Sequence, residues 1–385
     1  MPPPPSRRAR HPLVVIGNAV LTIIVLLFIA FGALIYLGKG MFDAPGPLDR
    51  ERSVVIPRDS GVRAIAEILR RENIIETPFV FVVGATLTRA TGELKAGEYL
   101  FDARVSMRDV LETLVEGKSI LHLVTIAEGL TSQQIVQRLR ESEVLTGELR
   151  EIPREGTLLP ESYKVMRGTP RQQLLSRMSA AHTRVLQEVW ERRASDLPVK
   201  TPDELITLAS IVEKETGKAD ERSRVAAVFI NRLNRKMRLQ SDPTIIYGMV
   251  GGRGTLGRPL SRDDVDRATP YNTYVIDGLP PGPIANPGRA SLEAVANPSR
   301  TRELYFVADG SGGHVFATTY DQHLKNVARW KDYMKEQATA GAQQPPPPEP
   351  AATAPTAPTA PQQKSAPPEK GVKRTGQTEK GSRTQ

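Results

Sequence analysis

The sequence predicts an α+β chain with one N-terminal transmembrane helix, a small mixed module and a larger domain of helices and loops. Three observations lead to this prediction. Residues 13–37 form a long apolar run. Residues 53–126 and 127–336 alternate helical and strand periodicities, and 39% hydrophobic with 25% charged residues is an ordinary globular composition. Residues 337–385 are rich in Pro and cannot bury enough apolar surface to fold, so we expect a disordered tail.

The apolar run at 13–37 matches the length of a membrane-spanning helix, since about 20 residues cross a bilayer core. A cleaved signal peptide is the alternative, but the run is too long and no clean small-residue cleavage site follows it. The preceding segment, residues 1–12, carries Arg7, Arg8 and Arg10. The positive-inside rule therefore predicts a cytoplasmic N-terminus, with everything after the helix on the far side of the membrane.

Composition excludes several classes of site. The net charge of +9 and the pI of about 9.7 would suit nucleic acid, but no nucleic-acid-binding motif occurs, so we expect no such partner. The chain has no Cys, which excludes disulfides, iron–sulfur clusters and thiol catalysis. Its five His residues lack metal-ligand spacing. We therefore predict no metal and no cofactor.

The region 53–126 reads as a compact module. Strands are predicted at 54–56, 95–101 and 121–126. Between the first two lies a segment whose apolar residues recur at helical spacing. A further helix is expected over 107–114, ending at Gly117. The order strand, helix, helix, strand is the layout of small sugar-binding modules of the LysM kind. We predict a LysM-like module here, although many small α+β domains share this layout.

A helix that ends in carboxylates is the first candidate for chemistry. Thr201 and Glu204 form a capping box, and Gly217 marks the expected end. The apolar stripe of this helix continues to Glu215, whereas Glu213 points about 200° away. Burial at the end of the stripe would raise the pKa of Glu215 and suit it to general acid catalysis. The alternative is an ordinary carboxylate in the last helical turn, which the helix dipole slightly disfavours.

A polar turn and a Tyr-containing loop follow this helix. Gln240 and Asp242 lie in the turn, and Tyr247 follows it. Asp242 either caps the following turn, or it serves as a second carboxylate or as a polar residue that lines a sugar cleft. Tyr271 and Asn272 precede a Pro/Gly-rich segment that is too turn-rich for regular structure. Tyr rings stack on sugar faces and Asn amides bind hydroxyls, so these five residues are the candidates for positioning a substrate.

Several long, ordered motifs carry a resemblance to a known family. They are EGTLLPESY at 155–163, ASIVEKET at 209–216, VFINRL at 228–233, MRLQSDPTIIYG at 237–248, YNTY at 271–274, GLPPG at 278–282 and LYFVADG at 304–310. Together they resemble the MltG (YceG-like) endolytic murein transglycosylases over roughly residues 54–330. The Pro-rich tail is not part of that pattern.

The resemblance implies a lyase that cuts the β-1,4 bond between N-acetylmuramic acid and N-acetylglucosamine within nascent glycan strands and leaves 1,6-anhydro ends. It implies that Glu215, with Glu213 as the fallback, is the catalytic acid. It also implies a bacterial inner-membrane protein with a periplasmic catalytic domain over 127–336, which binds peptidoglycan strands and works beside peptidoglycan synthases. Two alternatives stay open: a hydrolase using Glu215 with Asp242, and a non-enzymatic wall-binding scaffold.

Overall fold

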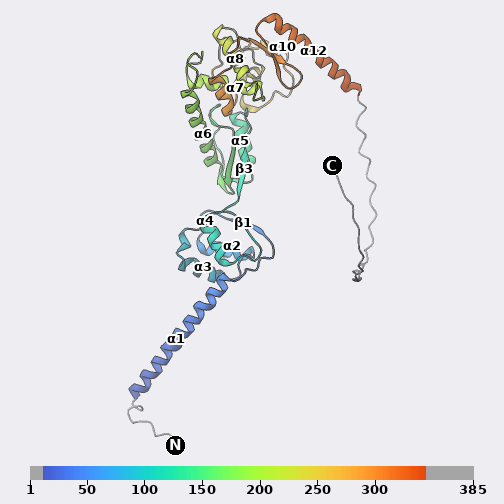
Figure 1. The fold of residues 1–385 in the computed structure, drawn as a ribbon. Coiled ribbons are helices and arrows are strands. Elements are labelled where there is room, and N and C mark those ends of the chain that lie inside the picture. Colours follow the sequence, from blue (N-terminus) through green and yellow to red (C-terminus); the bar gives the residue numbers. More distant parts are fainter. Residues whose placement is uncertain (1–11, 344–385) are drawn as a thin grey trace, which may run out of the picture. The chain divides into compact units, whose positions relative to one another are not determined.

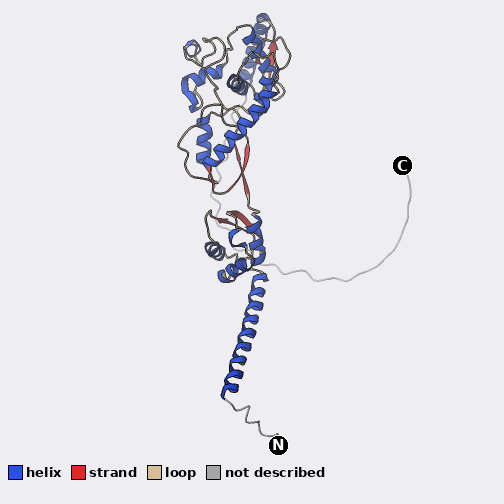
Figure 2. Cartoon of the chain, turned by 90° about the vertical axis from the view of Figure 1, so that its left-hand side faces the viewer, coloured by secondary structure: helices blue, strands red, loops and turns tan. Residues whose placement is uncertain are grey.

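The structure is a computed structural model that describes residues 12–343; the segments 1–11 and 344–385 lie outside the described residues. Within that range the chain is mostly helical, and its strands pair into four two-stranded sheets (Figure 2). The presence of both helices and strands, which the α+β prediction requires, is therefore confirmed. The basic N-terminal residues and most of the predicted tail fall in the undescribed segments.

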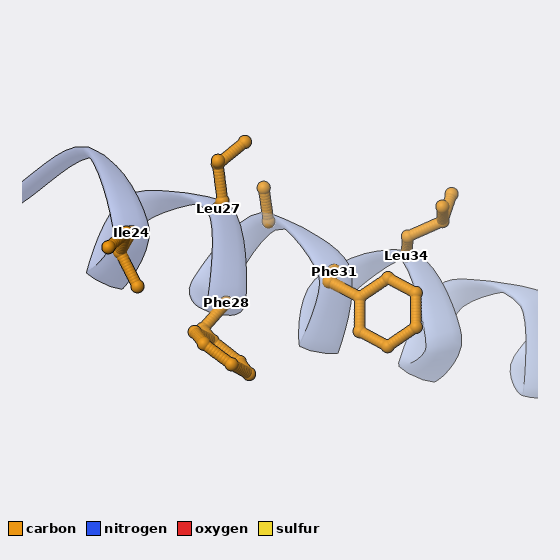
Figure 3. Close-up of a pocket in the computed structure, with 6 residues that line it drawn as sticks. Ile24, Leu27, Phe28, Phe31 and Leu34 are labelled. Atoms are coloured by element: carbon orange, nitrogen blue, oxygen red, sulfur yellow. The ribbon is translucent and has the colours of Figure 1, made fainter. Parts of the chain in front are cut away.

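The first helix, α1 (Pro12–Asp43), confirms the predicted apolar helix. Its mean hydropathy over the most apolar window is 2.9, and none of that window is buried. Figure 3 shows Ile24, Leu27, Phe28, Phe31 and Leu34 projecting from its middle, with carbon as the only side-chain element. The shallow hollow between them is lined by this one helix. Such a surface is costly in water, and it fits a single-pass membrane anchor.

The end of α1 joins the small module, defined here as the elements from β1 to α4. These are β1 (Arg52–Ile56), α2 (Val62–Arg71), α3 (Pro78–Leu87), η2 (Ala90–Gly92), β2 (Gly97–Phe101) and α4 (Met107–Glu116). Strands β1 and β2 pair antiparallel. Phe42, at the end of α1, is buried in the module's core, and Asp43 pairs with Arg108 at 2.6 Å. The elements follow the predicted order, while the likeness to LysM modules stays a prediction.

The third strand predicted for the module pairs elsewhere. Strand β3 (Leu121–Thr125) is antiparallel to β5 (Ser162–Met166), so its hydrogen bonds go to the following region. Helix α5 (Ser132–Glu141) packs on this ribbon through a core that includes Ile135, Leu139 and Tyr163. Two short strands, β4 (Leu145–Thr146) and β6 (Thr169–Pro170), pair in parallel nearby.

The larger domain is organised around a central helix, α7 (Pro202–Glu215), whose residues from Leu205 to Val212 are all buried. It packs against α8 (Arg222–Asn234) and α11 (Arg289–Ala296), and α6 (Arg171–Glu191) contributes to the same core (Figure 1). The remaining elements are α9 (Asp242–Val250), η3 (Gly251–Arg253), α10 (Arg262–Asp266), β7 (Tyr305–Ala308), β8 (His314–Ala317) and α12 (Tyr320–Gln343). Helix α12 thus continues past residue 336, where the sequence places the start of the tail.

Candidate active site

The sequence of α7 determines where its two glutamates lie. The hydroxyl of Thr201 accepts a hydrogen bond from the backbone N–H of Glu204, and Pro202 occupies the first turn, as predicted. The reciprocal half of the predicted capping box is not formed, because the Glu204 carboxylate accepts from the N–H of Lys200 and not from that of Thr201. The helix ends at Glu215 because Thr216 adopts extended backbone, with φ −143° and ψ 131°. The predicted stop at Gly217 is therefore two residues beyond the last helical residue. Glu215 sits where the buried helix meets a polar turn.

The carboxyl of Glu215 is partly buried and has one short hydrogen bond. The hydroxyl of Ser241 donates to Glu215 Oε1 at 2.5 Å. Ser241 is only 2% exposed, and its own N–H donates to Thr273 Oγ1 at 2.9 Å, so the donor is fixed in place. Burial raises the pKa of Glu215 to about 7; the Ser241 hydrogen bond opposes this, and the charge of Asp242 adds to it. A large fraction of Glu215 is therefore protonated at neutral pH.

Two basic side chains lie near enough to Glu215 to oppose the rise in its pKa. One is the guanidinium of Arg232, which is 8% exposed and donates to the carbonyl of Leu239 at 2.8 Å. The other is His314, whose Nδ1 lies 2.9 Å from a carboxylate oxygen of Glu221. Sequence reasoning missed His314, because a single His on a strand carries no recognisable spacing. These groups limit how far burial raises the pKa of Glu215.

Gln240 and Asp242, on either side of Ser241, are both exposed. The hydroxyl of Tyr274 donates to Asp242 Oδ1 at 2.7 Å, and Asp242 is the first residue of α9. Gln240 has a positive φ of 51°, and its N–H donates to the carbonyl of Thr273 at 3.1 Å. The turn therefore places a buried hydroxyl toward Glu215 and two polar side chains toward solvent.

Tyr247 and Tyr271 form a partly exposed aromatic pair. Their ring centroids are 4.8 Å apart and the rings are tilted by 59°. The hydroxyl of Tyr247 donates to Glu155 Oε2 at 3.3 Å. The other oxygen of Glu155 accepts from the N–H of Ser132 at 2.7 Å and from the amide of Asn286 at 2.9 Å. Burial is the largest influence on Glu155 and raises its pKa, while these hydrogen bonds oppose it.

Sequence reasoning did not select Glu155 or Asn286, although both lie in segments that it singled out. Asn286 is fully buried, and its amide also donates to the carbonyl of Leu130 at 3.1 Å. Its carbonyl accepts from the N–H of Leu158 at 3.0 Å. Asn286 therefore ties the Pro/Gly-rich loop to the segment that carries Glu155. The only signal in the sequence was an acidic residue at the start of the EGTLLPESY motif.

Asn272 is fully buried, and its side chain is committed to its own loop. Its amide donates to the carbonyls of Val265 at 2.9 Å and Arg267 at 2.7 Å, and its carbonyl accepts from the N–H of Tyr274 at 2.9 Å. These contacts hold the loop that carries Tyr271 and Tyr274. The structure thus shows Asn272 as a buried support of this loop and not as an exposed contact.

Glu213 contacts a different set of groups from Glu215. One of its oxygens accepts from the N–H of Gly288 at 2.9 Å, and the other lies 3.9 Å from the guanidinium of buried Arg222. Glu128 lies at the same distance from Arg222. A cation and a backbone donor both stabilise an ionised carboxylate. These contacts give Glu213 structural partners that Glu215 lacks.

Within the described residues, no group of three or more His, Cys, Asp or Glu side chains is arranged to hold a metal ion. The site instead combines one carboxyl with a raised pKa, a fixed hydroxyl partner, an exposed carboxylate and two partly exposed tyrosine rings. A carboxyl that is partly protonated at pH 7 can deliver a proton to a leaving oxygen and then take one back.

Comparison with known proteins identifies the group to which these motifs belong. A family model described as the YceG-like family matches residues 54–329. An endolytic murein transglycosylase of Streptococcus pneumoniae is 31% identical over 362 residues, covering 79% of this chain and 64% of that protein. One from Bacillus subtilis is 28% identical, covering 76% of this chain and 89% of that protein. A crystal structure of a yceG-like protein from Listeria monocytogenes aligns over 72% of this chain with 28% identity and a TM-score of 0.46.

Proposed function

The chain belongs to the YceG-like family, and on that premise we propose that it is a membrane-anchored endolytic murein transglycosylase. It cuts the β-1,4 bond between N-acetylmuramic acid and N-acetylglucosamine inside glycan strands and ends them in 1,6-anhydro-muramic acid. The observation that carries this proposal is Glu215, a carboxyl whose pKa burial raises to about 7 beside an exposed polar turn.

One carboxyl is sufficient for the reaction. Protonated Glu215 donates its proton to the glycosidic oxygen while the bond to the muramic acid C1 breaks toward an oxocarbenium-like state. The resulting carboxylate takes the proton of the muramic acid's C6 hydroxyl, and that oxygen bonds to C1 to close the anhydro ring. Glu215 is protonated again at the end, and no water is consumed. A pKa near 7 serves both steps, since the group must first give and then accept a proton.

The glycan is held by side chains around the acid. Gln240 and Asp242 offer hydrogen-bonding groups at the exposed turn, and the rings of Tyr247 and Tyr271 offer apolar faces to sugar rings. Asn272 supports the loop of Tyr271, so we assign it a positioning role rather than a direct contact.

The location follows from α1 and its flanks. We propose that α1 crosses the bacterial inner membrane once with the basic N-terminus in the cytoplasm, so that residues after Asp43 face the periplasm. The small module follows the membrane directly, and a LysM-like role in holding glycan would suit that place. Strands still attached to a synthase emerge at the same surface, which makes peptidoglycan synthases the expected partners.

The test uses the full chain in detergent with uncrosslinked glycan strands and analyses the products by mass spectrometry. Wild type should yield anhydro ends, and Glu215→Gln should lower the rate by about 10²–10⁴, the usual contribution of a general acid. Glu213→Gln is the matched control, a glutamate two residues away on the same helix. Products that are heavier than the anhydro products by the mass of one water would show that the protein is a hydrolase. If the wild type leaves every strand intact, the non-enzymatic wall-binding scaffold is favoured.

A further inference from the structure

A groove beside α5 shares no lining residue with the contacts of Glu215, and its lining combines apolar side chains with Gln and Arg. It has a volume of about 490 Å³ and lies between α5 and η3. Leu130 and Ile152 supply apolar surface, and Gln133, Gln137 and Arg138 from α5 supply polar groups. Among the described residues that line it, none is aromatic. An apolar floor with a few convergent polar groups is the usual form of a ligand site.

The groove carries positive charge that the described part of the chain does not neutralise. Arg138 and Arg253 are exposed and make no hydrogen bond or ion pair with any described residue. Glu141 is the one acidic residue in the lining, and its carboxylate accepts a hydrogen bond from the amide of Gln137 at 2.8 Å. Gln133 likewise has no hydrogen-bond partner among the described residues. Two guanidinium groups and one amide are therefore available to a ligand.

The turn that carries Arg253 has a backbone conformation that depends on glycine and is hydrogen-bonded to the start of α5. Arg253 lies between glycines, and Gly254 has a φ of +129°, which side chains rarely tolerate. A Cβ at Gly254 would also lie 3.2 Å from the amide nitrogen of Gln134. The hydroxyl of Thr131, at the start of α5, donates to the carbonyl of Gly252 at 2.5 Å. The turn is thereby held against α5, with Arg253 beside the groove.

The groove lies within reach of a strand bound at Glu215. Helix α9 starts one residue after Ser241, the partner of Glu215, and runs directly into η3, which carries Arg253. Its 9 residues span about 13 Å at 1.5 Å per residue. A groove at this distance can hold a substituent of the same glycan strand whose sugar backbone passes the acid.

We propose that this groove binds the peptide stem that the muramic acid residues of a murein strand carry. Guanidinium forks match carboxylates, and Gln amides match peptide groups, while the lack of aromatic rings argues against a sugar as the occupant. The inference rests on the proposed function and adds a preference to it: strands that bear acidic stems are cut faster than strands without them.

The test compares kcat/KM of the full chain on uncrosslinked strands with stems and on the same strands stripped of stems by an amidase. Wild type should favour the strands with stems. The double variant Arg138→Gln/Arg253→Gln should lower that preference about tenfold, the size expected for two exposed charge-assisted contacts. Arg138→Lys/Arg253→Lys should restore part of it, and 0.5 M salt should weaken it. Equal rates on both substrates in wild type would overturn the proposal.

Arg300→Gln/Arg302→Gln is the matched control, since it removes two exposed arginines outside the groove. It should keep the preference. A binding assay tests the groove independently of cleavage. The fluorescence anisotropy of a fluorescein-labelled stem peptide is measured with the Glu215→Gln variant, with and without the two groove substitutions. A tenfold weaker affinity with them supports the groove even if no strand is ever cut, and an unchanged affinity overturns it.

Discussion

Replacing Glu215 by Gln should stabilise the larger domain at alkaline pH, and the size of the gain follows from the pKa of Glu215. Burial raises that pKa from 4.5 to about 7 in the folded state. One pKa unit corresponds to 1.36 kcal/mol, so ionised Glu215 costs about 3 kcal/mol of folding free energy. Because the pKa of Glu215 is higher in the folded state than in the unfolded state, its contribution to stability is fully present below pH 4.5 and is lost as the pH rises through 7.

Gln carries no charge at any pH, so Glu215→Gln should unfold at nearly the same temperature as wild type at pH 4. At pH 8 the variant should be more stable by about 3 kcal/mol, or roughly 6–12 °C in Tm for a domain of this size. Fluorescence reports this unfolding, because Trp190, one of the two tryptophans, packs on the core that contains α7.

Glu213→Gln is the control for this experiment. Glu213 accepts a hydrogen bond from Gly288 and faces Arg222, so its loss should bring no alkaline gain and should destabilise the domain at pH 8. A Glu215→Gln gain of equal size at pH 4 and pH 8 would refute the reasoning, because the gain would then come from packing and not from charge. The absence of any gain at pH 8 would refute it as well.

Further predictions concern the neighbours of Glu215. Since the general acid must be protonated, kcat/KM should fall above a pH of about 7; Ser241→Ala should move this fall upward by about 1–2 pH units, and Asp242→Asn should move it downward. If neither substitution shifts the pH at which kcat/KM falls, a group other than Glu215 is responsible for that fall. Glu155→Ala should cost about 2–3 kcal/mol in thermal unfolding, because it leaves buried donors unpaired. Tyr247→Phe removes one of those donors but keeps the ring, and it should cost less than 1.5 kcal/mol; an equal cost for both variants would mean that the Tyr247 hydroxyl, and not the two other donors, accounts for the effect of Glu155.

Local signals in the sequence identified the elements that carry the site. The N-cap at Thr201 and the apolar stripe of α7 are short-range features; they predicted the helix and placed Glu215 at the end of its buried face, although the predicted stop at Gly217 was two residues too late. The apolar run of α1 is likewise a local property. Each of these predictions depends on residues within one element, so periodicity and capping chemistry were sufficient.

Such short-range signals could not predict contacts between residues that are far apart in the sequence. Strand β3 follows the small module in the sequence, yet its register is set by β5, where Leu121 faces Met166. Asn272 has the amide that a sugar site requires, but three contacts within its own loop use that amide. Glu155 reaches Tyr247 across 92 positions. Residue type alone cannot show which partners a folded chain brings together.

The partner of each glutamate accounts for the contrast between Glu213 and Glu215. The partners of Glu213, the guanidinium of Arg222 and the N–H of Gly288, can only donate hydrogen bonds. A hydroxyl can donate to a carboxylate or accept from a carboxylic acid, so Ser241 can stay bonded to Glu215 in both protonation states. A group that must give a proton and then take one back benefits from such a partner. Because positions 213 and 215 point about 200° apart on one helix, the end of α7 directs one carboxyl group toward Arg222 and Gly288 and the other toward the turn at Ser241.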